Sequence, residues 1–293
     1  MFHLGRYQDI IYNQGSYIVM EAPSKKFSTF DPTGSPQFKK ILTSVGSNLN
    51  TLWRHPFDPD IVIINKMHNS VFLFDKKARK MKKICSTTSP FIILSSIKLI
   101  AADKALIGYY EDPYIALIKF DPDFDGEVDF KKLDKIRLID PKESDRMKIG
   151  CQGIVLCNYH RDFVATVGSA SIETLHSIIC GKIDKGKRKM RVLRRIDPKI
   201  RLETMMSIIS AFQIIVSEKM PSKFIFVGIT FKAKSSKLVY FFYDYKMGKV
   251  LDLGQRRTEL GRCFRMVVCE DQESLMVADT HGNLVSVELN FGL

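Results

Sequence analysis

Apolar residues along the chain occur in short runs separated by polar turns, and no stretch shows the spacing of a long amphipathic helix. Residues 17–31 and 61–75 superimpose without a gap at a shift of 44 positions. Each copy is an apolar strand, a polar turn and a second strand that ends on Phe-Asp. Residues 107–121 repeat this design after a further shift of 46 positions, so the pattern predicts three copies of one β-hairpin.

The same hairpin returns in the second half of the chain. One copy ends at Asp244 and another ends at Glu288, 44 residues later, while residues 162–184 form a more divergent copy. An apolar segment precedes each hairpin, and a short basic or mixed segment follows most of them. Six units of four strands, with a spacing of about 44 residues, are typical of β-propeller blades.

We therefore predict an all-β fold, a six-bladed β-propeller of four-stranded antiparallel blades that forms a single domain over residues 1–293. The sixth unit ends after its third strand, so we expect the N-terminal segment to supply the missing outer strand and close the ring. The Asp or Glu that ends each third strand is expected to accept backbone N–H groups of the following turn. A pair of β-sandwiches is the alternative, but it does not explain the repeat period.

Three of these units carry a resemblance to a known family: IGYYEDPYIALIKFDPD from Ile107, QGIVLCNYHRDFVATVGSASIETLHSI from Gln152, and KFIFVGITF followed by KLVYFFYDYKMGKVLDL. In order and spacing they resemble the TolB-like six-bladed β-propeller proteins, and the resemblance covers nearly the whole chain. It implies a propeller without established catalytic residues, often exported or lipid-anchored. The chain also resembles WD40 repeats, because Phe74-Asp75 stands at the Trp-Asp position, although the upstream Gly-His element is absent.

The composition is that of a globular chain with a basic excess: Lys and Arg number 45, Asp and Glu number 32, and the formal charge is +13. The longest uncharged run, residues 204–217, is shorter than the roughly 18 residues that a membrane-spanning helix needs. The six cysteines lie in apolar runs without a Cys-x-x-Cys pair, which indicates reduced, buried thiols. The N-terminus lacks signal-peptide features, so we expect a cytoplasmic protein; an exported or cell-envelope protein is the alternative if an upstream signal is missing.

Two basic runs hold the charge excess. Residues 76–83 and 182–201 contain sixteen basic and two acidic residues, so the rest of the chain has 29 basic and 30 acidic residues. Both runs lead into the predicted outermost strand of a blade, where lysines prevent edge-to-edge pairing of sheets. The alternative is a patch that attracts a polyanion. The candidate binding residues are Lys76, Lys77, Arg79, Lys80, Lys82, Lys83, Lys187, Arg188, Lys189 and Arg191.

The motif DPDFDGEVD at residues 121–129 is a candidate calcium loop. Oxygen ligands at alternate positions and a glycine at the sixth position let one turn wrap a hard cation. Position twelve is Lys132, where an EF-hand has Glu, so the loop is closer to the calcium hairpins of integrin-type propellers. A solvated acidic turn is the alternative interpretation. The candidate metal ligands are Asp121, Asp123, Asp125, Glu127 and Asp129.

No GxSxG, P-loop or GxGxxG motif is present, and the histidines show no paired metal spacing. We therefore predict a monomeric, non-catalytic binding scaffold with basic faces on blades two and four, for an acidic protein or other polyanion; nucleic acid is supported by charge alone. No cofactor other than calcium is expected. The alternative function is a calcium-assisted propeller hydrolase or lactonase. Such enzymes collect ligands from several blades at a channel mouth, whereas the predicted calcium loop belongs to one blade, which counts against catalysis.

Overall fold

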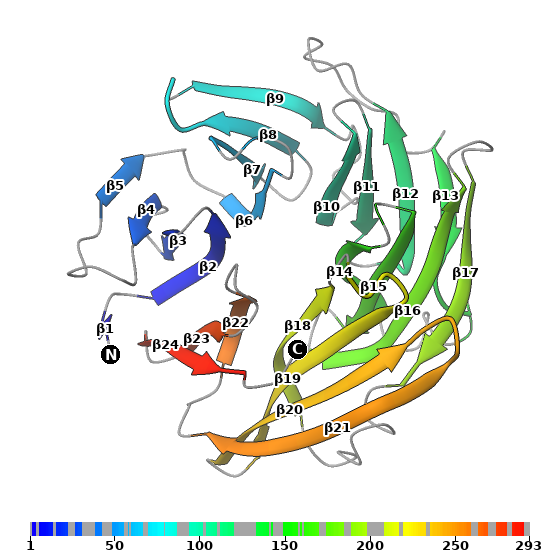
Figure 1. The fold of residues 1–293 in the computed structure, drawn as a ribbon. Coiled ribbons are helices and arrows are strands. Elements are labelled where there is room, and N and C mark those ends of the chain that lie inside the picture. Colours follow the sequence, from blue (N-terminus) through cyan, green and yellow to red (C-terminus); the bar gives the residue numbers. More distant parts are fainter. Residues whose placement is uncertain are drawn as a thin grey trace. The chain divides into compact units, whose positions relative to one another are not determined.

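The computed structural model of the chain describes residues 2–3, 6–13, 16–22, 27–30, 39–42, 49–55, 58, 60–66, 70–78, 80–86, 94–101, 104–109, 112–119, 133–140, 142, 149–157, 159, 161–169, 174–184, 189–197, 208–216, 219–232, 235–258, 263–268, 274–279 and 283–289. The described strands form six four-stranded antiparallel sheets (Figure 1). The sheets fall into two compact units: unit 1 contains β1–β9 and β22–β24, and unit 2 contains β10–β21. Among the described residues, no helix is long and apolar enough to cross a membrane.

Unit 1 contains three of the sheets. The first consists of β2 (Arg6–Asn13), β3 (Ser16–Ala22), β4 (Phe27–Phe30) and β5 (Lys39–Leu42) in that order. The second consists of β6 (Leu49–Arg54), β7 (Ile61–Lys66), β8 (Ser70–Asp75) and β9 (Lys80–Ser86). The third has the order β1 (Phe2–His3), β24 (Asn283–Glu288), β23 (Ser274–Asp279) and β22 (Cys263–Val268).

Unit 2 contains the other three sheets. The first consists of β10 (Leu94–Ala101), β11 (Lys104–Tyr109), β12 (Tyr114–Lys119) and β13 (Asp134–Arg137). The second consists of β14 (Ile149–Cys157), β15 (Asp162–Ser169), β16 (Thr174–Asp184) and β17 (Lys189–Ile196). The third consists of β18 (Ile208–Val216), β19 (Lys223–Lys232), β20 (Ser235–Asp244) and β21 (Lys249–Thr258). Each predicted hairpin forms the second and third strands of one sheet. The repeat found in the sequence therefore corresponds to a repeat of sheets.

The N-terminal strand completes the last sheet. Phe2 pairs with Leu284 and His3 pairs with Asn283, so β1 lies beside β24 as the outermost strand of a sheet whose other strands come from the C-terminal part. The prediction that the N-terminal segment supplies this strand is confirmed. Pairing the two ends of the chain covers an edge that β24 would otherwise present to solvent.

A β-bulge recurs near the start of every first strand. The register against the second strand shifts by one residue, which leaves one extra residue each time: Gln8, Asn50, Ser95, Gln152, Ser210 and Phe264. In unit 2 the bulge on β14 lies beside the neighbouring sheet, because Ile154 N donates to Ser96 Oγ of β10 at 3.2 Å. The bulge is therefore a backbone feature of each repeat, and the spacing of apolar residues alone does not predict it.

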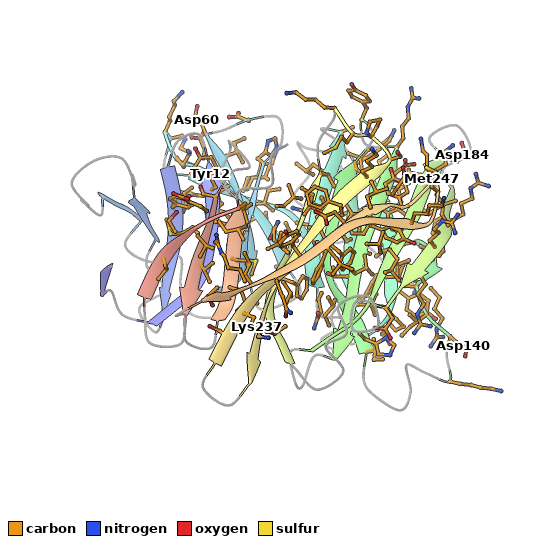
Figure 2. The ribbon with its side chains drawn as sticks, turned by 60° about the horizontal axis from the view of Figure 1, so that its bottom comes forward. Tyr12, Asp60, Asp140, Asp184, Lys237 and Met247 are labelled. Atoms are coloured by element: carbon orange, nitrogen blue, oxygen red, sulfur yellow. The ribbon has the colours of Figure 1, made fainter. Side chains whose placement is uncertain are left out.

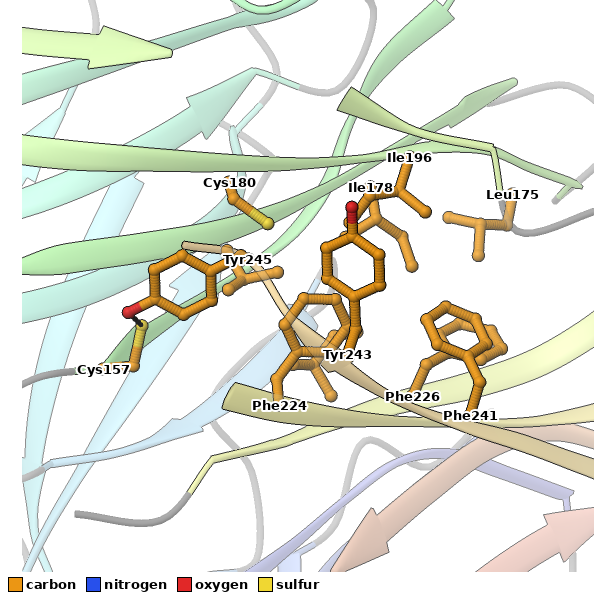
Figure 3. Packing of buried hydrophobic residues seen from close by; sticks show 12 residues of the cluster. Cys157, Leu175, Ile178, Cys180, Ile196, Phe224, Phe226, Phe241, Tyr243 and Tyr245 are labelled. Carbon is orange, nitrogen blue, oxygen red and sulfur yellow. Dashed lines mark hydrogen bonds between the residues drawn. The ribbon is translucent and has the colours of Figure 1, made fainter. Parts of the chain in front are cut away.

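The core of unit 2 lies between its sheets. Alternate residues of β14–β17 point to opposite faces, so Val164 and Cys180 pack against Phe224 and Phe241 of the next sheet, within one buried cluster (Figure 3). Phe163 and residues on the other face pack against the β10–β13 sheet in a second cluster. Side-chain stacks such as Phe226 on Phe241, with ring centroids 5.0 Å apart, fill the space between sheets. Blade-on-blade packing of this kind is what a propeller requires.

Candidate binding surfaces on the outer strands

The two basic runs reach the outer edges of their sheets. β9 and β17 are the last strands of their sheets in space, so residues 80–83 of the first run and 189–196 of the second lie on outer strands as predicted, whereas Lys182 and Asp184 lie on the third strand, β16. Lys76 and Lys77 lie in the turn before β9, Lys80, Lys82 and Lys83 lie on β9, and Lys189 and Arg191 lie on β17. Arg79, Lys187 and Arg188 lie outside the described residues.

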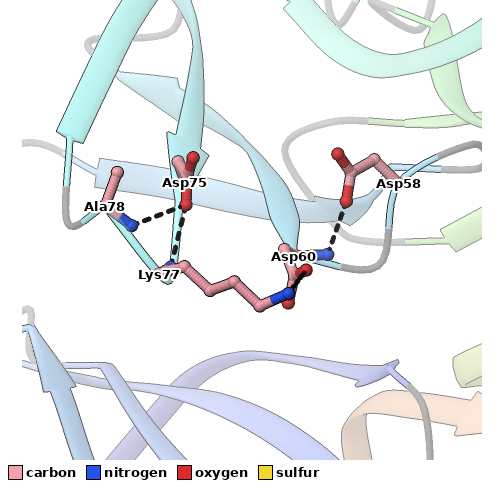
Figure 4. Close-up of polar contacts among 5 residues, drawn as sticks. All are labelled: Asp58, Asp60, Asp75, Lys77 and Ala78. Carbon is pink, nitrogen blue, oxygen red and sulfur yellow. Dashed lines mark hydrogen bonds and ion pairs between the residues drawn. The ribbon is translucent and has the colours of Figure 1, made fainter.

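The turn after β8 is closed by the aspartate that ends the strand. Asp75 Oδ1 accepts the backbone N–H groups of Lys77 and Ala78, each at 2.8 Å (Figure 4). Asp244, at the end of β20, accepts the N–H groups of Lys246 and Met247 at 3.0 and 2.9 Å. The predicted role of the strand-end carboxylate is confirmed in these two sheets, where it accepts backbone N–H groups of the following turn.

The lysines of the turn after β8 face acidic residues of their own sheet. Lys77 Nζ lies 2.5 Å from Asp60 Oδ2, and Asp58 Oδ1 accepts the N–H of Asp60 at 2.8 Å (Figure 4). The hydrogen bond with Asp60 raises the pKa of Lys77. Burial lowers the pKa of Lys76, and the charges of Asp60 and Asp58 oppose that shift. Local carboxylates therefore already compensate the positive charge at this end of the first basic run.

Sequence reasoning missed this pairing, although the register contains a signal for it. Ile61 at the start of β7 lies opposite Asp75 at the end of β8. Residues that precede Ile61 therefore lie beside residues that follow Asp75, and Lys76 N donates to Asp60 O at 2.9 Å. Because the hairpin repeat can be found in the sequence, it could have predicted that Asp58 and Asp60 lie beside Lys76 and Lys77.

The second basic strand, β17, differs because one of its arginines binds the next sheet. Arg194 Nε donates to Tyr245 O at 2.7 Å and Arg194 Nη2 donates to Lys246 O at 3.0 Å, in the turn after β20. Gly248 of that turn has φ 74°, and a Cβ there would lie 2.7 Å from the Arg194 guanidinium. Glycine is needed on both counts. Arg194, which was not among the predicted site residues, joins two neighbouring sheets.

Tyr245, in turn, reaches the sheet that carries Arg194. Its hydroxyl donates toward the carboxylate of Asp162 at 2.8 Å and toward Pro221 O at 2.6 Å, and it lies 3.6 Å from Cys157 Sγ (Figure 3). Burial is the main reason that the pKa of the Tyr245 hydroxyl is raised, and burial also raises the pKa of the Cys180 thiol. Cys151, Cys157 and Cys180 are buried and not in disulfides, which confirms the prediction for these three.

Two cations lie directly opposite each other on the rim of this sheet. The register aligns Cys157 with Asp162, Asp162 with Lys182, and Lys182 with Arg191, so these four side chains share one face of the sheet. Asp162 is buried, whereas Lys182 and Arg191 are exposed. Like charges in directly opposed positions repel each other, and an anionic ligand would relieve this repulsion.

The outer strands are also bulged. The register against the third strand shifts by one residue on β5, β9, β17 and β21, with Ile41, Ile84, Leu193 and Leu251 as the extra residues. A bulge disrupts a continuous edge and hinders the addition of a further strand. This observation favours the edge-protection interpretation for the backbone of these strands.

The candidate calcium ligands Asp121, Asp123, Asp125, Glu127 and Asp129 lie outside the described residues, so calcium binding stays a prediction. Within the described part of the chain, no group of three or more His, Cys, Asp or Glu residues is placed to hold a metal ion. Among the histidines, His55 Nδ1 accepts the N–H of Asp58 at 2.9 Å, and His176 Nδ1 lies 2.8 Å from Ser177 Oγ. Both make local structural hydrogen bonds.

Comparison with known proteins shows the fold. No family model matches the chain, and no curated protein matches it either. Among solved structures, it is similar to the β-propeller domain of Myceliophteria thermophila Cps50 (Swd1), with a TM-score of 0.60 and 7% identity over 97% of this chain and 84% of that one. It is also similar to the N-terminal domain of Nup159, with a TM-score of 0.53 and 8% identity over 96% and 75% of the two chains. The fold is thus a β-propeller with four-stranded antiparallel blades, and the predicted TolB-like membership has no support at the family level.

Proposed function

We propose that this protein is a non-catalytic binding scaffold that uses its basic outer strands to hold an acidic protein or another polyanion. The six sheets would be the blades of one ring, closed where β1 pairs with β24. Support for the ring comes from the six sheets, from this pairing of the two chain ends and from the propeller fold of similar structures. Rigid propellers present edges and loops as binding platforms without requiring chemistry at a single centre.

The observation that carries the proposal is the opposed pair Lys182 and Arg191. Both side chains are exposed on one face of the same sheet, and Arg194 occupies the next row of that face, opposite Cys180. The nearest carboxylate in the row, Asp162, is buried and accepts a hydrogen bond from Tyr245. Clustered cations at an exposed rim attract anionic partners in a salt-sensitive way.

Binding to immobilised heparin tests the proposal. We expect retention at about 50 mM salt that falls steeply by about 300 mM, since screening weakens exposed charge interactions. Arg191→Glu and Lys182→Glu should each shift elution to lower salt. Lys77→Glu is the matched control: it makes the same charge change at a lysine already paired with Asp60, and should shift elution less. Absence of salt-sensitive retention at low salt would overturn the proposal.

The calcium-assisted hydrolase or lactonase remains a prediction from the sequence, as do the cytoplasmic location and the monomeric state.

A further inference from the structure

The turn between β14 and β15 contains a tyrosine that neither core packing nor backbone preference requires. Tyr159 is 65% exposed, the highest value among the large hydrophobic side chains of the described residues. Its φ of 51° lies in the left-handed region, where glycine and asparagine are favoured and a bulky residue is strained. An exposed aromatic ring on a strained backbone points to a functional contact, and the neighbouring side chains indicate its kind.

This turn lies at the same end of the sheet as the opposed pair of cations. Ile183 N donates to Arg161 O at 2.7 Å, so the residues just before β15 run beside the β16 residue that follows Lys182. Lys182 in turn pairs with Arg191 on β17. Neighbouring strands lie about 4.8 Å apart, so the four strands that carry the turn and the two cations span roughly 15 Å.

Three exposed cations accompany the exposed ring. Arg161 belongs to the same turn as Tyr159, while Lys182 and Arg191 lie on β16 and β17. Figure 2 labels Asp184 at the end of β16, which marks this end of unit 2. We name the group formed by Tyr159, Arg161, Lys182 and Arg191 the turn-end surface.

The acidic residues of the same sheet face compensate this charge only in part. Asp162, which pairs with Lys182, is buried and accepts a hydrogen bond from Tyr245. Asp184 occupies the next row of the face, where it pairs with Lys189. With Lys189 and the three cations of the turn-end surface, four basic residues stand against these two acidic ones, so the surface keeps a net positive charge.

The combination of an aromatic ring with cations selects among polyanions. Carboxylates of an acidic peptide would satisfy the cations, but a run of acidic residues has no planar group for the ring of Tyr159. In a nucleic-acid duplex the bases are already stacked on one another. A single strand offers both parts, because its phosphates match the cations and an unpaired base can stack on the tyrosine, whatever the base sequence.

We propose that the turn-end surface binds single-stranded nucleic acid, with a base stacked on Tyr159 and phosphates on Lys182 and Arg191. The proposal deepens the scaffold function above by naming its polyanion, and it rests on that function. A helically stacked strand has one phosphate per about 3.4 Å, so about four nucleotides cover the roughly 15 Å from the turn to the outer strand. The phosphates supply salt-sensitive affinity, and the stacked base supplies the preference for a single strand.

Fluorescence anisotropy with labelled oligonucleotides tests this inference. The probe is an oligothymidylate of ten nucleotides. An abasic strand of the same length and a peptide of ten glutamates are the comparison ligands. We expect the oligothymidylate to bind roughly tenfold more tightly than the abasic strand, because the two have the same phosphates and only the former has a base to stack.

Substitutions at position 159 separate stacking from a structural role. Tyr159→Phe keeps the ring and should bind the oligothymidylate as the unchanged protein does. Tyr159→Asn should weaken oligothymidylate binding roughly tenfold and leave the affinity for the abasic strand unchanged. Because asparagine favours the left-handed conformation, the urea midpoint of Tyr159→Asn should equal or exceed that of the unchanged protein. A purely structural tyrosine would give a lower midpoint without a loss specific to the oligothymidylate.

Charge-reversal variants of the full chain locate the phosphates. Lys182→Glu and Arg191→Glu should weaken the oligothymidylate and the abasic strand by similar factors and reduce the salt dependence of both. Lys77→Glu is the matched control, since it makes the same charge change at a lysine that is paired with Asp60, and it should alter both affinities less.

The outcomes separate the two proposals. Equal affinity for the oligothymidylate and the abasic strand, with heparin retention intact, overturns the nucleic-acid site and leaves the scaffold; this comparison uses the unchanged protein, so it decides even if a variant unfolds. Full oligothymidylate affinity in Tyr159→Asn does the same. Tighter binding of the glutamate peptide than of the oligothymidylate also overturns the site and assigns the surface to an acidic protein. Absence of heparin retention at low salt overturns both proposals.

Discussion

Two turns of the protein share a backbone design and use it differently. The turns after β8 and after β20 each begin with an aspartate whose Oδ1 accepts two backbone N–H groups. In each, the residue after the aspartate donates its N–H to the residue before the second strand: Lys76 to Asp60 and Tyr245 to Ser222. The repeat therefore preserves the turn in detail, while the side chain after the aspartate changes.

The two residues after the aspartate decide where the turn makes its side-chain contacts. Lys76 is followed by Lys77, which pairs with Asp60 of the same sheet, so the charge is compensated locally. Tyr245 instead inserts into the neighbouring sheet, where it reaches Asp162, and Arg194 returns from that sheet to the turn. The first turn belongs to one blade, whereas the second joins two blades. Lys182 and Arg191, on the same face of the neighbouring sheet as Asp162, are exposed.

Replacing the aspartate that accepts the turn N–H groups should have the largest effect on stability, and the effect should differ between the two turns. Asp244 is 5% exposed and its two hydrogen bonds are part-buried, so Asp244→Ala removes a buried carboxylate and the acceptor of two N–H groups, and we expect a loss of roughly 2–4 kcal/mol. Asp75→Ala makes the same change at a more exposed turn and should cost about 0.5–2 kcal/mol. Urea denaturation measures both. Equal losses would show that the surrounding sheets do not distinguish the turns.

Removing one hydroxyl should have the next largest effect. Tyr245→Phe keeps the ring in the core but takes a donor from buried Asp162, which should cost about 1–3 kcal/mol in free energy of unfolding. A double-mutant cycle with Asp162→Asn isolates the contact, and we expect the two changes to be non-additive. Additive losses would mean that the hydroxyl contributes mainly through Pro221.

Much of the fold could be predicted from the sequence because the repeat is local. Apolar alternation and strand-end aspartates lie within one hairpin, so a single pass along the chain finds them. The contacts of Arg194 could not be predicted in this way, since it binds Tyr245 across 51 positions and sits in a basic run that resembles a solvated edge. The spacing of a run does not show which of its arginines is held by a neighbouring blade.

The candidate surface was predicted only in part for the same reason. Residues 80–83 and 189–196 of the basic runs lie on outer strands as predicted, but Lys182 lies on β16, and the lysines at residues 76–77 are compensated by Asp60, whose position follows from strand register. Tyr159 looks like an ordinary turn residue in sequence. Its place near Lys182 arises because the residues before β15 run beside β16. Register and sheet order, which depend on tertiary packing, supply the missing information.

The smallest effect concerns the turn before β7, where His55 Nδ1 accepts the N–H of Asp58. Burial lowers the pKa of His55 below its ordinary 6.5, although the charge of Asp58 opposes the shift. Above pH 6.5 the imidazole is neutral in both the folded and unfolded states, so His55 causes no loss in the free energy of unfolding. As the pH falls below 6.5 the unfolded state takes up the proton first, so the free energy of unfolding should fall until the folded pKa is reached.

Asn at position 55 offers an acceptor oxygen in place of Nδ1 and does not titrate, so His55→Asn should flatten the pH dependence of stability between about pH 5 and pH 7. Urea midpoints at several pH values measure it. Because the turn after β20 has no such histidine among its described contacts, a matched pH series on Tyr245→Phe should keep the same slope as the unchanged protein. A slope that persists in His55→Asn would assign the pH dependence to other groups.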